Sequence, residues 1–259
     1  MSSINVLGVR VDRVDMMGAL CQIDSFVKKE GLHHVITLNA EIIYRAQSDE
    51  KLKELINSAD LVTPDGSGVV WAAGILGEPL TERVTGIDLM EEICRQAHHN
   101  GWKIYLLGGA PGIADEAAEK LRTRFPNINI VGTQHGYFPE NEEDEVLARI
   151  KAKEPDIIFV ALGAPRQEFW IRKNKSRLLA KVAVGVGGSF DVISGRIKRA
   201  PVWMQKLKLE WLARLIKEPW RAKRMMALPK FMISVLKSKS QKSSRPDGDQ
   251  NKKKKRRLP

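Results

Sequence analysis

The sequence predicts an α/β protein: a single Rossmann-like domain with a mostly parallel sheet, followed by a C-terminal helical appendage. Through residue 195, short apolar runs alternate with helical patterns, which is typical of strand–helix–strand units in a parallel sheet. After Gly195 the chain becomes strongly basic and its apolar residues recur at helical spacing. The length, 259 residues, suits one large domain with an appendage.

Six short runs are the expected strands, and they are apolar throughout, as in strands buried on both faces. They cover residues 35–38, 61–62, 103–107, 128–131, 157–161 and 182–186. Helical patterns precede and separate them, over residues 15–29, 40–56, 67–76, 86–99, 113–125, 142–153 and 165–174. We therefore expect residues 1–195 to form one α/β core.

The rest of the chain divides into an appendage, residues 196–237, and a tail, residues 238–259. Residues 203–216 predict a basic amphipathic helix, in which Trp, Met and Leu recur at three- and four-residue spacing between Lys and Arg. Pro219 is expected to start a second helix, and a short third helix is expected after Pro229. The tail is rich in Ser, Lys and Gln and is expected to be disordered.

Charge is distributed unevenly along the chain, whose net charge is +12. Residues 196–259 hold 21 basic and 4 acidic residues, a net +17, whereas residues 1–195 hold 22 basic and 27 acidic residues, a net −5. This asymmetry indicates a polyanionic partner, either nucleic acid or an anionic membrane. The apolar stripe between the charges favours a membrane, because nucleic-acid sites use basic grooves with stacking aromatics.

The location expected from the sequence is the cytoplasm, with peripheral attachment to the inner face of the cell membrane. The N-terminus lacks the pattern of a secretory signal, and no apolar run is long enough to span a bilayer. Cys21 and Cys94 stand outside any disulfide or zinc pattern and are expected to be reduced thiols.

Polar and glycine residues follow five of the predicted strands. In an open parallel sheet these positions meet at one edge, where ligands bind, so we expect a cleft for a polar ligand there. The residues concerned include Thr37, Asn39 and Glu41; Asp65 and Gly66; Gly108, Gly109 and Gly112; Gly163, Arg166 and Gln167; and Gly187, Gly188 and Asp191.

The glycine-rich segment 106–112 is either a phosphate cradle at a helix N-terminus or a tight strand-to-helix turn. It matches neither the dinucleotide-binding G-x-G-x-x-G pattern nor a P-loop. The next predicted strand ends at Val131-Gly-Thr-Gln134, without the acidic residue that would bind a ribose. These features argue against a nicotinamide-dependent dehydrogenase.

Three polar residues each have a structural and a functional interpretation. Asp65 is either the N-cap of the helix after it or a general base in the cleft. Arg83 is either a surface arginine or part of the site. Gln167 either caps a helix or orients a sugar hydroxyl.

No metal or other cofactor is expected. The only D-x-D pattern is Asp247-Gly-Asp249 in the tail, and the five His residues lack metal-ligand spacing. A phosphate leaving group would then be stabilised by cationic side chains and backbone dipoles. Such side chains are concentrated in the C-terminal helices.

Six ordered motifs together resemble the WecG/TagA/CpsF family of bacterial glycosyltransferases. They are Thr37-Leu-Asn-Ala-Glu41, Asp60-Leu-Val-Thr-Pro-Asp-Gly-Ser-Gly68, Glu82-Arg-Val-Thr-Gly-Ile-Asp88, Leu106-Leu-Gly-Gly-Ala-Pro-Gly112, Ala161-Leu-Gly-Ala-Pro-Arg-Gln-Glu168 and the segment from Gly185 to Gly195, followed by Arg199-Ala-Pro201. The resemblance runs from about Ile4 to Leu236.

The resemblance implies an inverting, metal-independent hexosyltransferase. It would move N-acetylmannosamine from UDP-N-acetylmannosamine to N-acetylglucosamine on undecaprenyl diphosphate, in a β-1,4 linkage, for wall teichoic acid or a related polysaccharide. It also implies a membrane-binding appendage, and off-membrane homo-oligomers are plausible because an undocked appendage leaves apolar surface exposed.

The resemblance further implies roles for individual residues. Asp65 is the expected base, and Thr37, Asn39, Arg83 and Gln167 match other pocket positions. Tyr137 and Asp191 match positions expected to contact the uridine. From their place after the strands, Gly108, Gly109, Gly112 and Gly187 are expected to hold the UDP-sugar. Arg214, Arg221 and Arg224 are the appendage arginines expected to complete the site.

Two alternatives stay open at this point. The donor could be another UDP-hexose, such as the uronic acid of N-acetylmannosamine, used for a different surface polysaccharide. In a different class, the chain could be a basic-tailed nucleic-acid-binding protein, although no nucleic acid is expected as a partner.

Overall fold

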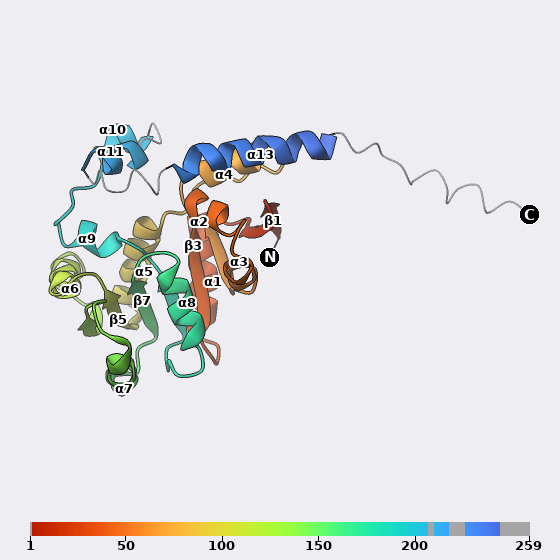
Figure 1. Ribbon diagram of the computed structural model, residues 1–259. Coiled ribbons are helices and arrows are strands. Elements are labelled where there is room, and N and C mark those ends of the chain that lie inside the picture. The colour runs from red at the N-terminus through yellow and green to blue at the C-terminus, as the bar shows by residue number, and fades with distance from the viewer. Residues whose placement is uncertain (1, 207–209, 218–225, 244–259) are drawn as a thin grey trace, which may run out of the picture.

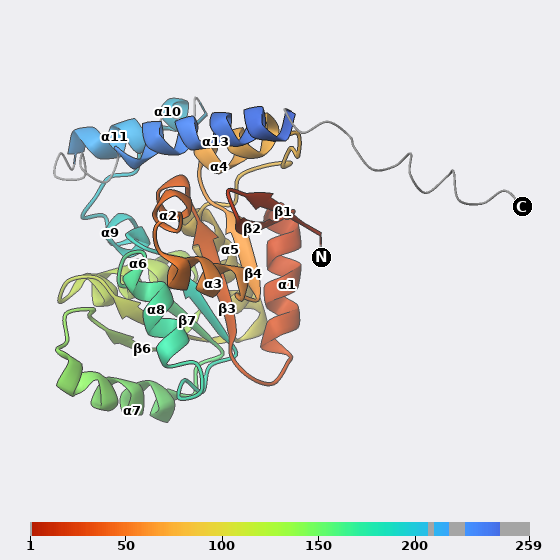
Figure 2. The ribbon, with the colours of Figure 1, turned by 45° about the vertical axis from the view of Figure 1, so that its right-hand side comes forward.

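The computed structural model describes residues 2–206, 210–217 and 226–243. Its centre is a six-stranded sheet in the order β4-β3-β8-β7-β5-β6, with every neighbouring pair parallel (Figures 1 and 2). The strands are β3 (His33–Leu38), β4 (Leu61–Pro64), β5 (Lys103–Gly108), β6 (Asn129–Gln134), β7 (Ile157–Ala161) and β8 (Val182–Gly185). The predicted α/β class and mostly parallel sheet are confirmed.

Helices cover both faces of this sheet, which explains why its strands are apolar throughout. Successive side chains point to opposite faces, so Val35 packs in one core and Ile36 in another. The first face is covered by α1 (Met16–Val27), α5 (Gly86–Asn100), α6 (Ile113–Arg124) and α9 (Ser189–Ile193). The second is covered by α2 (Ala40–Arg45), α3 (Glu50–Asn57), α7 (Glu143–Lys153) and α8 (Arg166–Lys173), with a short 3-10 turn, Glu140–Glu142, before α7. Helix α4 (Ser67–Ile75) lies above the carboxyl ends of the strands (Figures 1 and 2).

The structure differs from the predicted elements in three places within the core. One is α9, since no helix was predicted over residues 189–193. The single helix expected over residues 40–56 is two helices, because Asp49 starts a second one by accepting a hydrogen bond from the Leu52 N–H at 3.0 Å. The N-terminal residues, for which no strand was predicted, form a hairpin of β1 (Ser3–Val6) and β2 (Val9–Asp12). Its two-residue turn places Leu7 and Gly8 at positive φ, as tight hairpins require.

The C-terminal helices lie above the carboxyl ends of the strands (Figures 1 and 2). The helix predicted over residues 203–216 corresponds to α10 (Val202–Lys206) and α11 (Glu210–Lys217). The helix expected from Pro219 lies outside the described residues. The third predicted helix is α13 (Ala227–Ser243), which continues into the segment 238–243 that was expected to be disordered. Once a packed turn has nucleated a helix, Lys, Ser and Gln extend it at little cost.

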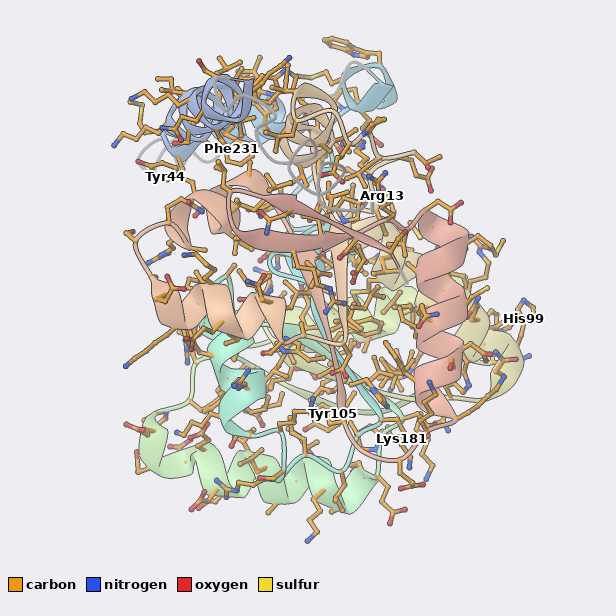
Figure 3. All side chains as sticks on the ribbon, turned by 90° about the vertical axis from the view of Figure 1, so that its right-hand side faces the viewer. Arg13, Tyr44, His99, Tyr105, Lys181 and Phe231 are labelled. Atoms are coloured by element: carbon orange, nitrogen blue, oxygen red, sulfur yellow. The ribbon has the colours of Figure 1, made fainter. Side chains whose placement is uncertain are left out.

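Helix α13 is part of the body's apolar core. Phe231 and Val235 have no exposed surface and pack with residues of α2 and α4. Figure 3 shows Phe231 and Tyr44 of α2 at this junction. Over residues 2–206, 210–217 and 226–243, no helix is long and apolar enough to span a bilayer.

Candidate active site

A cavity of about 370 Å³ opens at the carboxyl ends of β3, β4 and β8, the edge at which a ligand was expected. The loop after β7 and the appendage helix α11 complete its walls. The structure brings six predicted site residues together here: Thr37, Asn39, Asp65, Arg83, Gln167 and Gly187. They come from the ends of β3, β4 and β8, from α8 and from the loop before α5, so only the folded sheet makes them neighbours.

Two of these side chains, both at the end of β3, hold the local backbone. Thr37 is almost buried and donates its hydroxyl to the Gly185 carbonyl at 2.8 Å, which joins the ends of β3 and β8. Asn39 accepts a hydrogen bond from the Ile42 N–H at 3.0 Å and is therefore the N-cap of α2. Both residues shape the cavity wall as well as face it.

Asp65 is not the N-cap of α4. Gly66 occupies that position, and no side chain caps the helix. The carboxylate of Asp65 instead accepts a hydrogen bond from the N–H of Gly86, the first residue of α5, at 3.4 Å. The carboxylate therefore does not cap α4, and Asp65 lines the cavity.

Gln167 is held in one orientation by two contacts. Its Oε1 accepts a hydrogen bond from the Gly187 N–H at 3.1 Å, and its Nε2 donates to Glu168 Oε1 at 2.8 Å. Glu168 has no exposed surface, and burial raises its pKa to about 7. Glu168 was not among the predicted site residues, although it stands next to Gln167 in one of the quoted motifs.

Arg83 belongs to a charged network on one wall. Its Nη1 lies 2.6 Å from Oε2 of Glu210, on α11. Glu210 also accepts from Arg199 Nε at 3.2 Å, and Arg199 forms a two-pronged pair with Asp88. Neither Arg199 nor Glu210 was among the predicted site residues. Arg199 is the first residue of the quoted Arg-Ala-Pro motif, and Glu210 lies in the basic helix predicted over residues 203–216.

The other predicted donor-binding residues lie apart from this cavity's lining. Gly108, Gly109 and Gly112 form the turn between β5 and α6, Tyr137 follows β6 and is 72% exposed, and Asp191 is in the first turn of α9. A Cβ on Gly108 would lie 2.4 Å from the Ala161 carbonyl oxygen. The Gly109 N–H already donates to that same oxygen at 3.0 Å. Close packing against β7 therefore accounts for Gly108, whereas a Cβ on Gly109 would meet the Ile113 side chain of α6 at 2.9 Å.

The appendage arginines cannot be placed in the same way. Arg214 lies in α11, but its side chain is outside the described part of the structure, and Arg221 and Arg224 are outside it entirely. Among the side chains that the structure describes, no three His, Cys, Asp or Glu gather as metal ligands would.

Comparison with known proteins gives a consistent result over nearly the whole chain. The model of the glycosyl transferase WecG/TagA/CpsF family matches residues 4–245. A protein of Bacillus spizizenii is 39% identical over 203 residues, 78% of each chain. One of Staphylococcus aureus is 37% identical over 240 residues, 92% of this chain and 94% of its own length. Both relatives are named N-acetylglucosaminyldiphosphoundecaprenol N-acetyl-beta-D-mannosaminyltransferase.

Proposed function

The chain belongs to the WecG/TagA/CpsF family of glycosyltransferases, and we propose that it transfers N-acetylmannosamine from a UDP-linked donor to N-acetylglucosaminyl-diphospho-undecaprenol. The names of the relatives support the transferred sugar and the acceptor. The observation that carries the proposal is the Asp65 carboxylate, which lies in the cavity at the strand ends and does not cap the helix after it.

Asp65 acts as the general base in this proposal. The 4-hydroxyl of the acceptor's N-acetylglucosamine loses its proton to the Asp65 carboxylate as its oxygen bonds to the anomeric carbon. The bond from that carbon to the diphosphate breaks at the same time, and UDP leaves with the electron pair. A single displacement of this kind inverts the anomeric centre and gives the β-1,4 linkage.

The leaving diphosphate requires positive charge. Arg83 supplies it from the cavity wall, and Arg214, Arg221 and Arg224 of the appendage are proposed to add to it. Thr37, Asn39 and Gln167 shape the pocket for the reacting sugars. Thr37 and Gln167 tie their segments to the end of β8, and Asn39 caps α2, through the hydrogen bonds described above.

The UDP moiety is proposed to extend from Gly187 toward the ends of β5 and β6. There the exposed ring of Tyr137 can stack on the uracil, and Asp191 can accept a hydrogen bond. Gly112 begins α6 without a side-chain cap. Gly108 lets the turn pass close to β7 and Gly109 lets it pack against Ile113 of α6, so their contribution is to bring this loop to the nucleotide.

The appendage is proposed to hold the enzyme on the cytoplasmic face of the membrane, where the lipid-linked acceptor lies. Large exposed apolar side chains gather in it: Trp203, Trp211, Ile216, Met226, Met232, Ile233 and Leu236. Such a surface inserts into the headgroup region, and the surrounding Lys and Arg residues attract an anionic leaflet by about 1 kcal/mol each. Away from a membrane the same surface would favour association between copies of the chain.

A donor screen with a lipid-diphosphate-N-acetylglucosamine acceptor tests the activity. We expect UDP-N-acetylmannosamine to be the preferred donor among UDP-hexoses, including the corresponding uronic acid. Asp65→Asn should reduce kcat by about 100-fold or more while UDP still binds, since loss of a general base removes 10²–10⁴ of rate. Wild-type turnover in Asp65→Asn would show that another group takes the proton.

Binding to vesicles tests the location independently. The full-length protein should float with vesicles that contain anionic lipid, and should not with neutral vesicles at high salt. If the protein instead retards nucleic acid in a gel and does not bind anionic vesicles, the partner of the basic segment is nucleic acid and not a membrane.

A further inference from the structure

Three charged side chains from separate parts of the chain meet on one wall of the cavity. Arg83 precedes α5, Arg199 follows α9, and Glu210 is the first residue of α11. Arg83 faces Glu210 Oε2 at 2.6 Å, and Arg199 donates to Glu210 Oε1 at 3.2 Å. The Glu210 carboxylate therefore presents each of its oxygens to a different guanidinium group.

Arg199 does not depend on Glu210 for its position. Its Nη1 and Nη2 donate to the two oxygens of Asp88 at 2.6 and 2.9 Å. Burial alone would raise the pKa of Asp88, but the hydrogen bonds from Arg199 and Thr85 outweigh it and hold that pKa below its usual value. Asp88 therefore stays ionised and anchors Arg199 to α5.

The arrangement suits an exchange of anions. Arg83 and Arg199 offer planar, always-charged donors, which is the geometry that carboxylates and phosphates share. The side chains of Arg83, Arg199 and Glu210 are each about a quarter exposed, at 23%, 26% and 24%, so an anion from solvent can reach them. A phosphate group carries more negative charge than a carboxylate and has more acceptor oxygens.

We propose that Arg83 and Arg199 form a binding site for a phosphate group of the substrate's diphosphate, and that the Glu210 carboxylate occupies this site when no diphosphate is bound. The proposal rests on the proposed function, which brings a diphosphate into this cavity. Glu210 belongs to α11, whereas Arg83 is part of the body and Arg199, near the start of the appendage, is tied to the body through Asp88. Diphosphate binding thus exchanges a contact between α11 and the body for one between substrate and body.

Titration calorimetry on the full-length protein tests this, with UDP, inorganic pyrophosphate and uridine as probes. Glu210→Gln keeps the side chain's size and removes the competing charge, so UDP and pyrophosphate should bind about 5- to 10-fold more tightly, whereas uridine should not. Arg199→Gln should weaken UDP by about 10-fold or more, because a hydrogen bond to a charged group is lost. Arg199→Lys keeps the charge, so its affinity for UDP should lie between that of the wild type and that of Arg199→Gln.

The matched control is Glu78→Gln, which makes the same change of charge at an exposed ion pair with Arg13, outside the cavity. It should leave UDP affinity unchanged. Thermal unfolding of each variant separates lost binding from lost folding.

The outcomes distinguish this inference from the proposed function. If UDP binds to the wild type and Glu210→Gln binds it equally or more weakly, Glu210 only anchors α11 and the inference is wrong, while the proposed donor stands. If pyrophosphate binds more tightly to Glu210→Gln but no uridine nucleotide binds, the phosphate site stands and the proposed donor does not.

Discussion

Helix α13 has one face buried in the core and one face exposed. Substitutions at two neighbouring residues, one on each face, should separate their contributions to stability and to membrane binding. Phe231 has no exposed surface and packs with α2 and α4, whereas Met232, the next residue, is 45% exposed. Phe231→Ala removes a buried ring and leaves a cavity, so it should lower the free energy of unfolding by about 3–5 kcal/mol. Met232→Ala should change it by less than about 0.5 kcal/mol.

Membrane binding should show the opposite order, with Met232→Ala impaired and Phe231→Ala unaffected. Met232→Ala removes apolar surface that would enter the headgroup region, which costs about 1 kcal/mol and lowers partitioning onto anionic vesicles about fivefold. Phe231→Ala leaves that surface in place. Urea denaturation followed by circular dichroism measures the first effect, and vesicle flotation of the folded fraction measures the second.

A small loss of stability in Phe231→Ala, below about 1 kcal/mol, would refute the reasoning, because α13 would then not be packed on the body in solution. The same packing bears on truncation. Removing the chain from Arg196 onward would also remove α13 and expose the apolar residues of α2 and α4 beneath it. We therefore expect that truncation to be less stable than one made after Ser243.

Two further predictions concern the interior of the body. Burial raises the pKa of Glu168 from its ordinary value of 4.5 to about 7. Between those pH values the folded state binds a proton that the unfolded state has lost. The free energy of unfolding should therefore fall by about 3 kcal/mol as the pH rises from 4.5 to 7. Glu168→Gln should remove this part of the pH dependence. Urea denaturation at pH 5 and pH 8 measures the free energy of unfolding of both proteins, and an equal change between the two pH values in wild type and variant would contradict the prediction. Gly108→Ala should destabilise the protein by several kcal/mol, because its Cβ would meet the Ala161 backbone at 2.4 Å and its φ is +136°. The control Gly74→Ala, in α4 with open space around the added Cβ, should gain up to about 1 kcal/mol; normal stability in Gly108→Ala would mean that the glycine is there for a ligand rather than for packing.

The periodicity of apolar residues was enough to predict most elements of the body, because the spacing of apolar residues in a strand or a helix indicates which of its faces is buried. It failed where a short polar signal decides the structure. Asp49 divides the segment 40–56 into two helices through one capping hydrogen bond, and the hairpin of β1 and β2 is too short to show a long pattern. The helical continuation of α13 to Ser243 was not predicted. The polar composition of residues 238–243 indicates disorder, but these residues extend a helix that is already nucleated by packed residues before them.

The sequence by itself determined the parallel sheet, the edge at which polar side chains collect, and the basic, apolar-striped segment that follows the body. These depend on residue type and order, which a chain carries whether folded or not. Only the tertiary structure decided what each polar residue does. It placed Gly66 and not Asp65 at the start of α4, buried Glu168 beside Gln167, and brought Glu210 of the appendage onto Arg83 and Arg199. Hydrogen bonds and ion pairs act over about 3 Å between residues far apart in the chain, so no local pattern records them.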